Sequence, residues 1–155
     1  MTNNLTICNH LEKLIGEHLN DYLNMVEGLD FTLPEISPKC VSQSFPDTDN
    51  QSTSTHFNIV PTYSENEELS VGTDICTLNI SVFISCKRNK VVNLQKMVNG
   101  YTAAFEILLW HHQNLDGLTD ICDVISVDFY PAINGDLNVS GAELSLSIQY
   151  TKEYC

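Results

Sequence analysis

The fold is decided by two neighbouring segments, ICTLNISVFI at residues 75–84 and KVVNLQKMVNGYTAAFEILLWHH at residues 90–112. The first alternates apolar and polar residues with a period of two, which is typical of a strand with one buried face. In the second, apolar residues recur every three or four positions, as an amphipathic helix requires. These positions are Val91, Leu94, Val98, Tyr101, Phe105, Leu108 and His112. We therefore predict a strand over 75–84 and a long helix over 90–112.

Two further strands follow the predicted helix. Ile125, Val127 and Phe129 alternate with polar residues, and so do the apolar residues between 144 and 150. A strand of ten residues and a helix of about 22 residues each span about 33 Å, so the helix returns the chain to the start of the first strand. The next strand should then run parallel to the first. The last two strands are joined by an Asn- and Gly-rich stretch at 131–142 and should form a hairpin.

The N-terminal half divides into a helix and a polar segment. Apolar residues at helical spacing predict a helix over residues 5–27, with Asn3 or Thr6 as its cap and Gly28 as its stop. Residues 34–73 are rich in Pro, Ser, Thr and Asn, and we expect this segment to be mobile or ordered by a partner. A short strand is predicted inside it at residues 56–60.

These elements predict one α+β domain over residues 1–155. Its core would be a small mixed β-sheet of three to four strands or more. The N-terminal helix and the long central helix would pack on one face of that sheet. The opposite face would be polar enough to meet water or another subunit.

Charge and cysteine content limit the function classes. The 155 residues carry 20 acidic and 7 basic side chains, a formal net charge of -13, which argues against tight nucleic-acid binding and an anionic membrane surface. The charge has two readings that we hold equal: solubility by self-repulsion, or a surface that DNA passes or a basic partner meets. No run of 18 apolar residues predicts a membrane span. The six cysteines form no CxxC pair, and we interpret them as free thiols, with Cys76 and Cys86 as small core residues.

The search for catalytic chemistry finds no convergent motif. His111 and His112 come at the predicted helix C-terminus, where a cation is favourable, and we prefer that role to catalysis. Asp116, Asp120 and Asp123 lack EF-hand spacing, and a solvated turn is preferred to loose calcium binding. We therefore expect no enzyme activity, no cofactor and no metal.

Two groups of residues are candidate contacts with a subunit or partner. The basic cluster comprises Lys87, Arg88, Lys90 and Lys96, four of the seven basic residues. Local pairing with acidic residues is the alternative to contact with an acidic neighbouring surface. The second group lies in the polar connection before the last strand and comprises Asn134, Gly135, Asp136 and Asn138. For this group a plain surface loop is the alternative.

The element order resembles that of the tail terminator and tail completion proteins of tailed bacteriophages. The resemblance covers roughly residues 8–154 and rests on pattern, carried by TLNISVFISCKR, VVNLQKMVNGYTAAFEILLW, VISVDFYPAI and AELSLSIQYTKEY. It includes no invariant motif, so no site residue is carried over from the family.

The resemblance implies a structural subunit that forms a ring, usually of six copies, at the head-proximal end of the tail. Its partners would be itself, the tail tube protein and head–tail connector proteins, and DNA would pass without being tightly bound. The protein would reside in the virion tail and, during assembly, in the bacterial cytoplasm. The alternatives are another head–tail connector or minor tail protein and, more distantly, an acidic DNA-mimic inhibitor or a small enzyme.

Overall fold

The computed structural model describes residues 2–48, 50–51, 54–88, 93–133 and 138–154. They form a five-stranded sheet of order β1-β2-β3-β5-β4. Its strands are β1 (Val41–Ser42), β2 (Thr55–Ser70), β3 (Thr73–Lys87), β4 (Ile121–Tyr130) and β5 (Val139–Glu153). The pair β1–β2 is parallel and the other three pairs are antiparallel, so the sheet is mixed as predicted.

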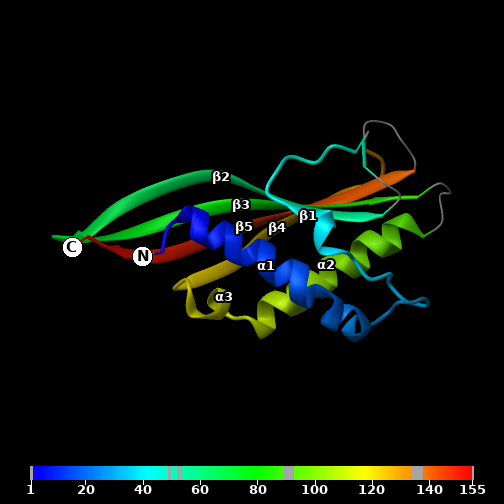
Figure 1. Ribbon diagram of the computed structural model, residues 1–155, viewed down its shortest axis with the longest axis horizontal. Coiled ribbons are helices and arrows are strands. Elements are labelled where there is room, and N and C mark those ends of the chain that lie inside the picture. Colours follow the sequence, from blue (N-terminus) through cyan, green and yellow to red (C-terminus); the bar gives the residue numbers. More distant parts are fainter. Residues whose placement is uncertain (1, 49, 52–53, 89–92, 134–137, 155) are drawn as a thin grey trace.

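The helices lie together along one side of the sheet (Figure 1). They are α1 (Asn4–Tyr22), α2 (Leu94–His111) and the short α3 (Asn114–Gly117), with 3-10 turns at Leu23–Met25 and Pro38–Cys40. One apolar core joins the inner faces of α1 and α2 to the sheet and includes Leu11, Ile15, Leu78, Ile80, Tyr101, Phe105, Leu144 and Leu146. The predicted α+β architecture, with both long helices on one face, is confirmed.

The directions of the strands agree with the prediction, which left the order of the strands in the sheet open. Helix α2 does connect β3 to a strand of the same direction, β4, because both are antiparallel to β5. The predicted β4–β5 hairpin is also confirmed. However, β5 lies between β3 and β4, so the two parallel strands are not neighbours.

The ends of α1 are set by local chemistry. Asn3 caps the helix: its side chain accepts from the Thr6 backbone, while the Thr6 hydroxyl accepts from the Asn3 backbone. The helix ends at Tyr22, not at residue 27 as predicted, and a 3-10 turn follows it. Gly28, with φ of +89°, therefore turns the chain after this 3-10 turn and does not stop the α-helix itself.

The segment at 34–73, which we expected to be mobile or ordered by a partner, contains regular structure over much of its length. A 3-10 turn, β1 and the whole of β2 occur there, and the strand predicted at residues 56–60 is the beginning of β2. Phe57 and Ile59 are fully buried, whereas every residue from Pro61 to Ser70 is exposed. The outer half of β2 is ordered by backbone pairing with β3 along its length, which needs no apolar side chains.

The predicted alternation in β4 is also wrong in part. The pairing with β5 shifts register between Val124 and Ser126, which places an extra residue, Ile125, in the strand. Cys122, Val124 and Val127 then pack against the core, while Ile125 is 64% exposed. The prediction assumed an uninterrupted period of two and therefore assigned Ile125 to the buried face. The β-bulge breaks this period and turns Ile125 outward.

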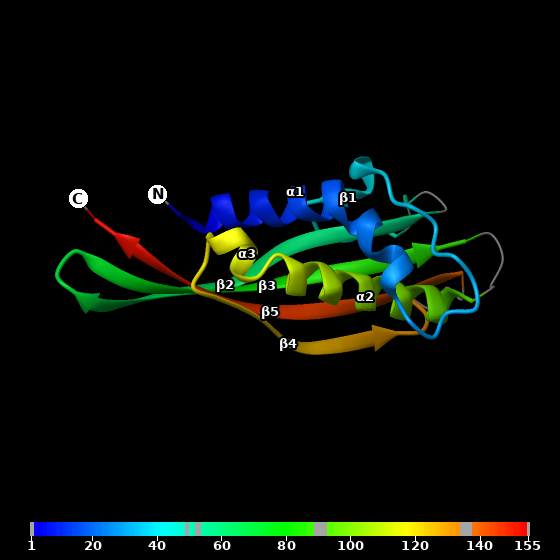
Figure 2. The same cartoon turned by 90° about the horizontal axis from the view of Figure 1, so that it is seen from below.

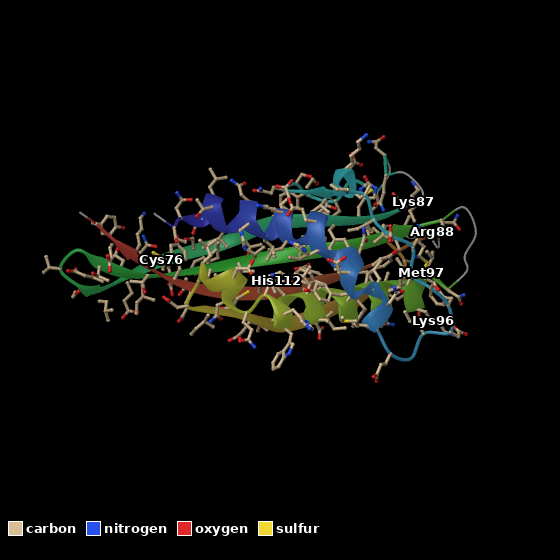
Figure 3. All side chains as sticks on the ribbon, turned by 60° about the horizontal axis from the view of Figure 1, so that its bottom comes forward. Cys76, Lys87, Arg88, Lys96, Met97 and His112 are labelled. Atoms are coloured by element: carbon tan, nitrogen blue, oxygen red, sulfur yellow. The ribbon has the colours of Figure 1, made fainter. Side chains whose placement is uncertain are left out.

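The β2–β3 hairpin extends past the helices at one end of the molecule (Figure 2). Both termini lie near this end. The opposite end of β3 carries Lys87 and lies beside the start of α2 (Figure 3). The long axis of the molecule therefore has a hairpin end and a Lys87 end.

Candidate assembly surface

The sheet has an open face, which we define as the side opposite the helices. Residues of β3 with even numbers, such as Leu78 and Ile80, are buried under the helices, so its odd-numbered residues and their cross-strand partners point to the open face. Acidic side chains are frequent on it. They are Glu65, Glu67, Asp123, Asp128, Glu143 and Glu153, as the strand register places them.

Glu143 lies at the centre of a polar network on the open face. Its Oε2 accepts from the Ser81 hydroxyl at 3.0 Å, and its Oε1 accepts from the Tyr130 hydroxyl at 3.4 Å. Asp128 pairs directly across from it, although like charges in this position are destabilising. Desolvation and the charges of Glu143 and Asp128 raise the pKa of Tyr130 above its ordinary value of 10.0. The sheet therefore presents concentrated negative charge to whatever this face meets.

The basic cluster lies at the Lys87 end. Lys87, Arg88 and Lys96 gather there in Figure 3. The Lys87 ammonium donates to the Thr48 carbonyl at 2.9 Å, and the Arg88 guanidinium donates to the Lys87 carbonyl. Lys96 is 3.8 Å from Asp30, and both side chains are largely exposed. In these contacts Lys87 and Arg88 donate to backbone carbonyls, and neither contact involves a carboxylate.

Some predicted contact residues lie outside the described residues: Lys90, Asn134, Gly135 and Asp136. Asn138 is described, and its carbonyl accepts from the Arg88 backbone at 3.1 Å. This contact ties the start of β5 to the end of β3. It brings one residue of the second predicted group to the same end of the molecule as the basic cluster.

An apolar recess, which sequence reasoning missed, opens at this end. It has a volume of about 350 Å³ and is lined by Pro46, Thr48, Phe83, Ile84, Ser85, Tyr130, Ala132, Ile133, Gly141 and Ala142. Thr48, one of the lining residues, accepts from Lys87 through its carbonyl, which brings an ammonium close to the recess. Since the lining comes from β3, β4, β5 and the segment before β2, no local spacing in the sequence predicts it.

A second polar cluster joins α1 to the C-terminal end of α2. Asp116 accepts from His112 Nδ1 at 2.7 Å and from His10 Nε2 at 3.0 Å. The Nε2 atom of His112 lies 3.2 Å from the Tyr22 hydroxyl, which adds a third contact to the ring. His111 lies in the last turn of α2 as predicted, with Nδ1 3.0 Å from the Ile107 carbonyl. We interpret this His10–Asp116–His112 cluster as a clasp between helices.

The three carboxylates considered for calcium have different surroundings. Asp116 belongs to the clasp, Asp120 accepts from the Thr151 hydroxyl at 2.7 Å, and Asp123 points to the open face. Within the described ranges, no three His, Cys, Asp or Glu side chains gather as a metal site would require.

The clasp predicts a pH dependence of stability. Desolvation raises the pKa of Asp116, but hydrogen bonds from His112 and His10 outweigh it, and the net pKa falls below 3.8. A group with a lowered folded-state pKa stabilises above its unfolded pKa, and this stabilisation is lost as pH falls through the folded value. Asp116→Asn keeps the positive φ of 61°, which Asn tolerates, but replaces one acceptor with a donor.

We expect Asp116→Asn to lower the free energy of unfolding by about 0.5–1 kcal/mol at pH 6, a value discounted for partial exposure. The difference from the wild type should disappear near pH 2. Urea denaturation at both pH values measures it, with Asp120→Asn as the control that leaves the clasp intact. A difference that persists at pH 2 would mean that the Asp116 charge is not its cause.

Five cysteines lie in the described part of the chain, and the pKa values resolved for three of them are raised. Cys8, Cys40, Cys76, Cys86 and Cys122 are free, and the predicted core positions of Cys76 and Cys86 are confirmed, since both are fully buried. Burial raises the pKa of Cys86 to about 11 and that of Cys122 to about 12. Thiols with such pKa values carry almost no thiolate at neutral pH and are poor nucleophiles.

No protein-family model matches the chain, and no curated protein matches it. None of the helices in the described ranges is both long and apolar enough to span a membrane.

Proposed function

We propose that the protein is a structural subunit that assembles into a ring at the head-proximal end of a phage or phage-like tail. In this role it is a tail terminator or tail completion protein that stops tube polymerisation and contacts the head–tail connector. The observation that carries the proposal is the open, acidic face of the sheet, with the helices confined to the other side. A subunit of this shape offers a polar wall to a channel and two free sheet edges to its neighbours.

The charge of the open face supports passage of DNA. Six copies at -13 each carry about -78 formal charges, and DNA carries one negative charge per about 1.7 Å of its axis. A lumen lined by Glu143, Asp128 and their acidic neighbours would repel the duplex and prevent it from binding to the wall. The order of elements, a helix, an extended segment, a strand, a long helix and a closing hairpin, supports the same family resemblance.

The mass of the protein in solution tests this proposal. We expect an oligomer of about 104 kDa, which is six copies of 17.4 kDa, by analytical ultracentrifugation, and annular particles by negative-stain electron microscopy. The fraction assembled should rise with protein concentration. A single 17.4 kDa species at every concentration would contradict the ring.

A further inference from the structure

The hairpin tip, residues 68–74, presents apolar side chains in an acidic setting. Val71 is 97% exposed and Leu69 is 64% exposed, the latter placed by a register shift between Glu68 and Ser70. Glu65 and Glu67 lie just behind the tip on the open face. Exposed apolar side chains at the end of a projecting hairpin are costly in water, and they are a feature of binding surfaces.

The backbone of the hairpin tip is held in place. Gly72 has φ of +82°, which the tight turn requires, and its carbonyl accepts from the Tyr154 backbone at 2.7 Å. Strand β3 pairs with β2 on one side and with β5 on the other as far as its first residue, Thr73. A binding element that is ordered before it binds loses little conformational entropy on docking.

The apolar recess is the feature that complements the hairpin tip. Its apolar lining includes Phe83, Ile133 and Ala142, and Lys87 lies close to it through its bond to the Thr48 carbonyl. Three of the seven basic residues of the chain, Lys87, Arg88 and Lys96, gather at this end. The recess therefore offers an apolar floor with Lys87 near Thr48 on one side and Glu143, bonded to Tyr130, on another. The tip offers apolar side chains and negative charge, so its carboxylates match the Lys87 side of the recess.

The tip of one molecule cannot reach its own recess. Both belong to β3, the tip at its first residue, Thr73, and the recess at Phe83–Ser85. Thr73 and Phe83 are ten residues apart along the strand, about 33 Å at 3.3 Å per residue. The occupant of the recess must come from a different molecule.

We propose that the hairpin tip of one copy docks in the apolar recess of a second copy. Leu69 and Val71 enter the recess, and Glu67 or Glu68 lies beside Lys87. This contact rests on the proposed ring and names how its subunits join. It uses two different surfaces of one chain, so it is a head-to-tail contact, which closes into a ring when the rotation between copies permits. Each subunit then gives one tip and receives another.

Two variants separate the halves of the contact. Val71→Asp puts a charge at the tip, where the exposed side chain has no folding role. Ala132→Glu puts a negative charge into the recess and leaves the tip unchanged. Burying an unpaired carboxylate in either position is unfavourable, so each variant alone should lose at least about 30-fold in association constant and stay monomeric where the wild type assembles. Trp110→Asp is the control, because it adds a charge at an exposed apolar residue of α2, on the helix side of the sheet and outside both surfaces and both sheet edges.

Mixing the two defective variants gives the decisive measurement. The intact tip of Ala132→Glu meets the intact recess of Val71→Asp, and the two remaining surfaces are both defective. An equimolar mixture should therefore form heterodimers and nothing larger, as sedimentation or native mass spectrometry would detect. Circular dichroism and urea denaturation check that each variant is folded.

The outcomes distinguish this contact from the ring itself. If the wild type assembles and both variants assemble equally well, the tip-to-recess contact is wrong and the ring proposal stands. If the mixture forms full-size oligomers or no dimers, the head-to-tail pairing of these surfaces is also wrong. A wild type that is monomeric at every concentration would overturn the ring and this contact together.

Discussion

Replacing Phe57 with Ala should lower the free energy of unfolding by about 3–5 kcal/mol, the loss typical of a buried aromatic residue. Phe57 is fully buried, and its ring meets Tyr101 edge-on at 6.3 Å and Phe105 at 6.1 Å between centroids. Phe57 therefore packs the beginning of β2 against α2. Since domains of this size are stable by about 5–15 kcal/mol, the loss is a large share of the total. Urea denaturation followed by circular dichroism measures it.

Tyr63→Ala is the matched control on the same strand. Tyr63 is also aromatic but is 53% exposed, and its hydroxyl donates to Glu65 at 2.7 Å. It lies beyond Pro61, where β2 has left the core, so its loss should change the free energy of unfolding by no more than about 0.5 kcal/mol. Equal effects of the two substitutions would show that the first half of β2 does not belong to the core.

This pair of residues also explains which parts of the fold the sequence predicts. Periodicity reports burial, and it identified β3, α2 and β5 because Leu78, Phe105 and Leu146 face one continuous core. The outer half of β2 has no buried face, so its alternation carries no apolar signal. Its order comes from pairing with β3, and a strand paired in this way needs only a partner of matching length. The same residues therefore read as a polar loop.

The residues of the candidate assembly surface could be predicted only where they are close together in the sequence. Lys87 and Arg88 are adjacent, so the basic cluster could be identified from the sequence and lies at one end of the molecule. The clasp joins His10 to Asp116 across 106 positions, and the apolar recess takes its lining from four separate segments. Such sites are produced by the order of strands in the sheet, and the prediction left the position of β5 between β3 and β4 open.

Glycine substitutions test the packing around the recess. A Cβ at Gly141 would lie 2.8 Å from the Ile84 carbonyl oxygen and 2.9 Å from Ile133 Cδ1. The Ile133 side chain can rotate away, but the Ile84 carbonyl belongs to the centre of the sheet and cannot move without disturbing the pairing of β3 with β5. We expect Gly141→Ala to lower the free energy of unfolding by about 1–3 kcal/mol.

Gly16→Ala should have the opposite sign, although it adds the same methyl group. Gly16 lies inside α1, and its nearest neighbour is Pro38 Cβ at 3.7 Å, an ordinary contact. Ala loses less backbone entropy than Gly in a helix, so stability should rise by about 0.5–1 kcal/mol. Urea denaturation of both variants gives the comparison, and a loss of stability in Gly16→Ala as well would mean that close packing does not distinguish the two sites. Because Gly141 also lines the apolar recess, displacement of Ile133 by the new methyl group should weaken assembly in Gly141→Ala, while Gly16→Ala assembles as the wild type does.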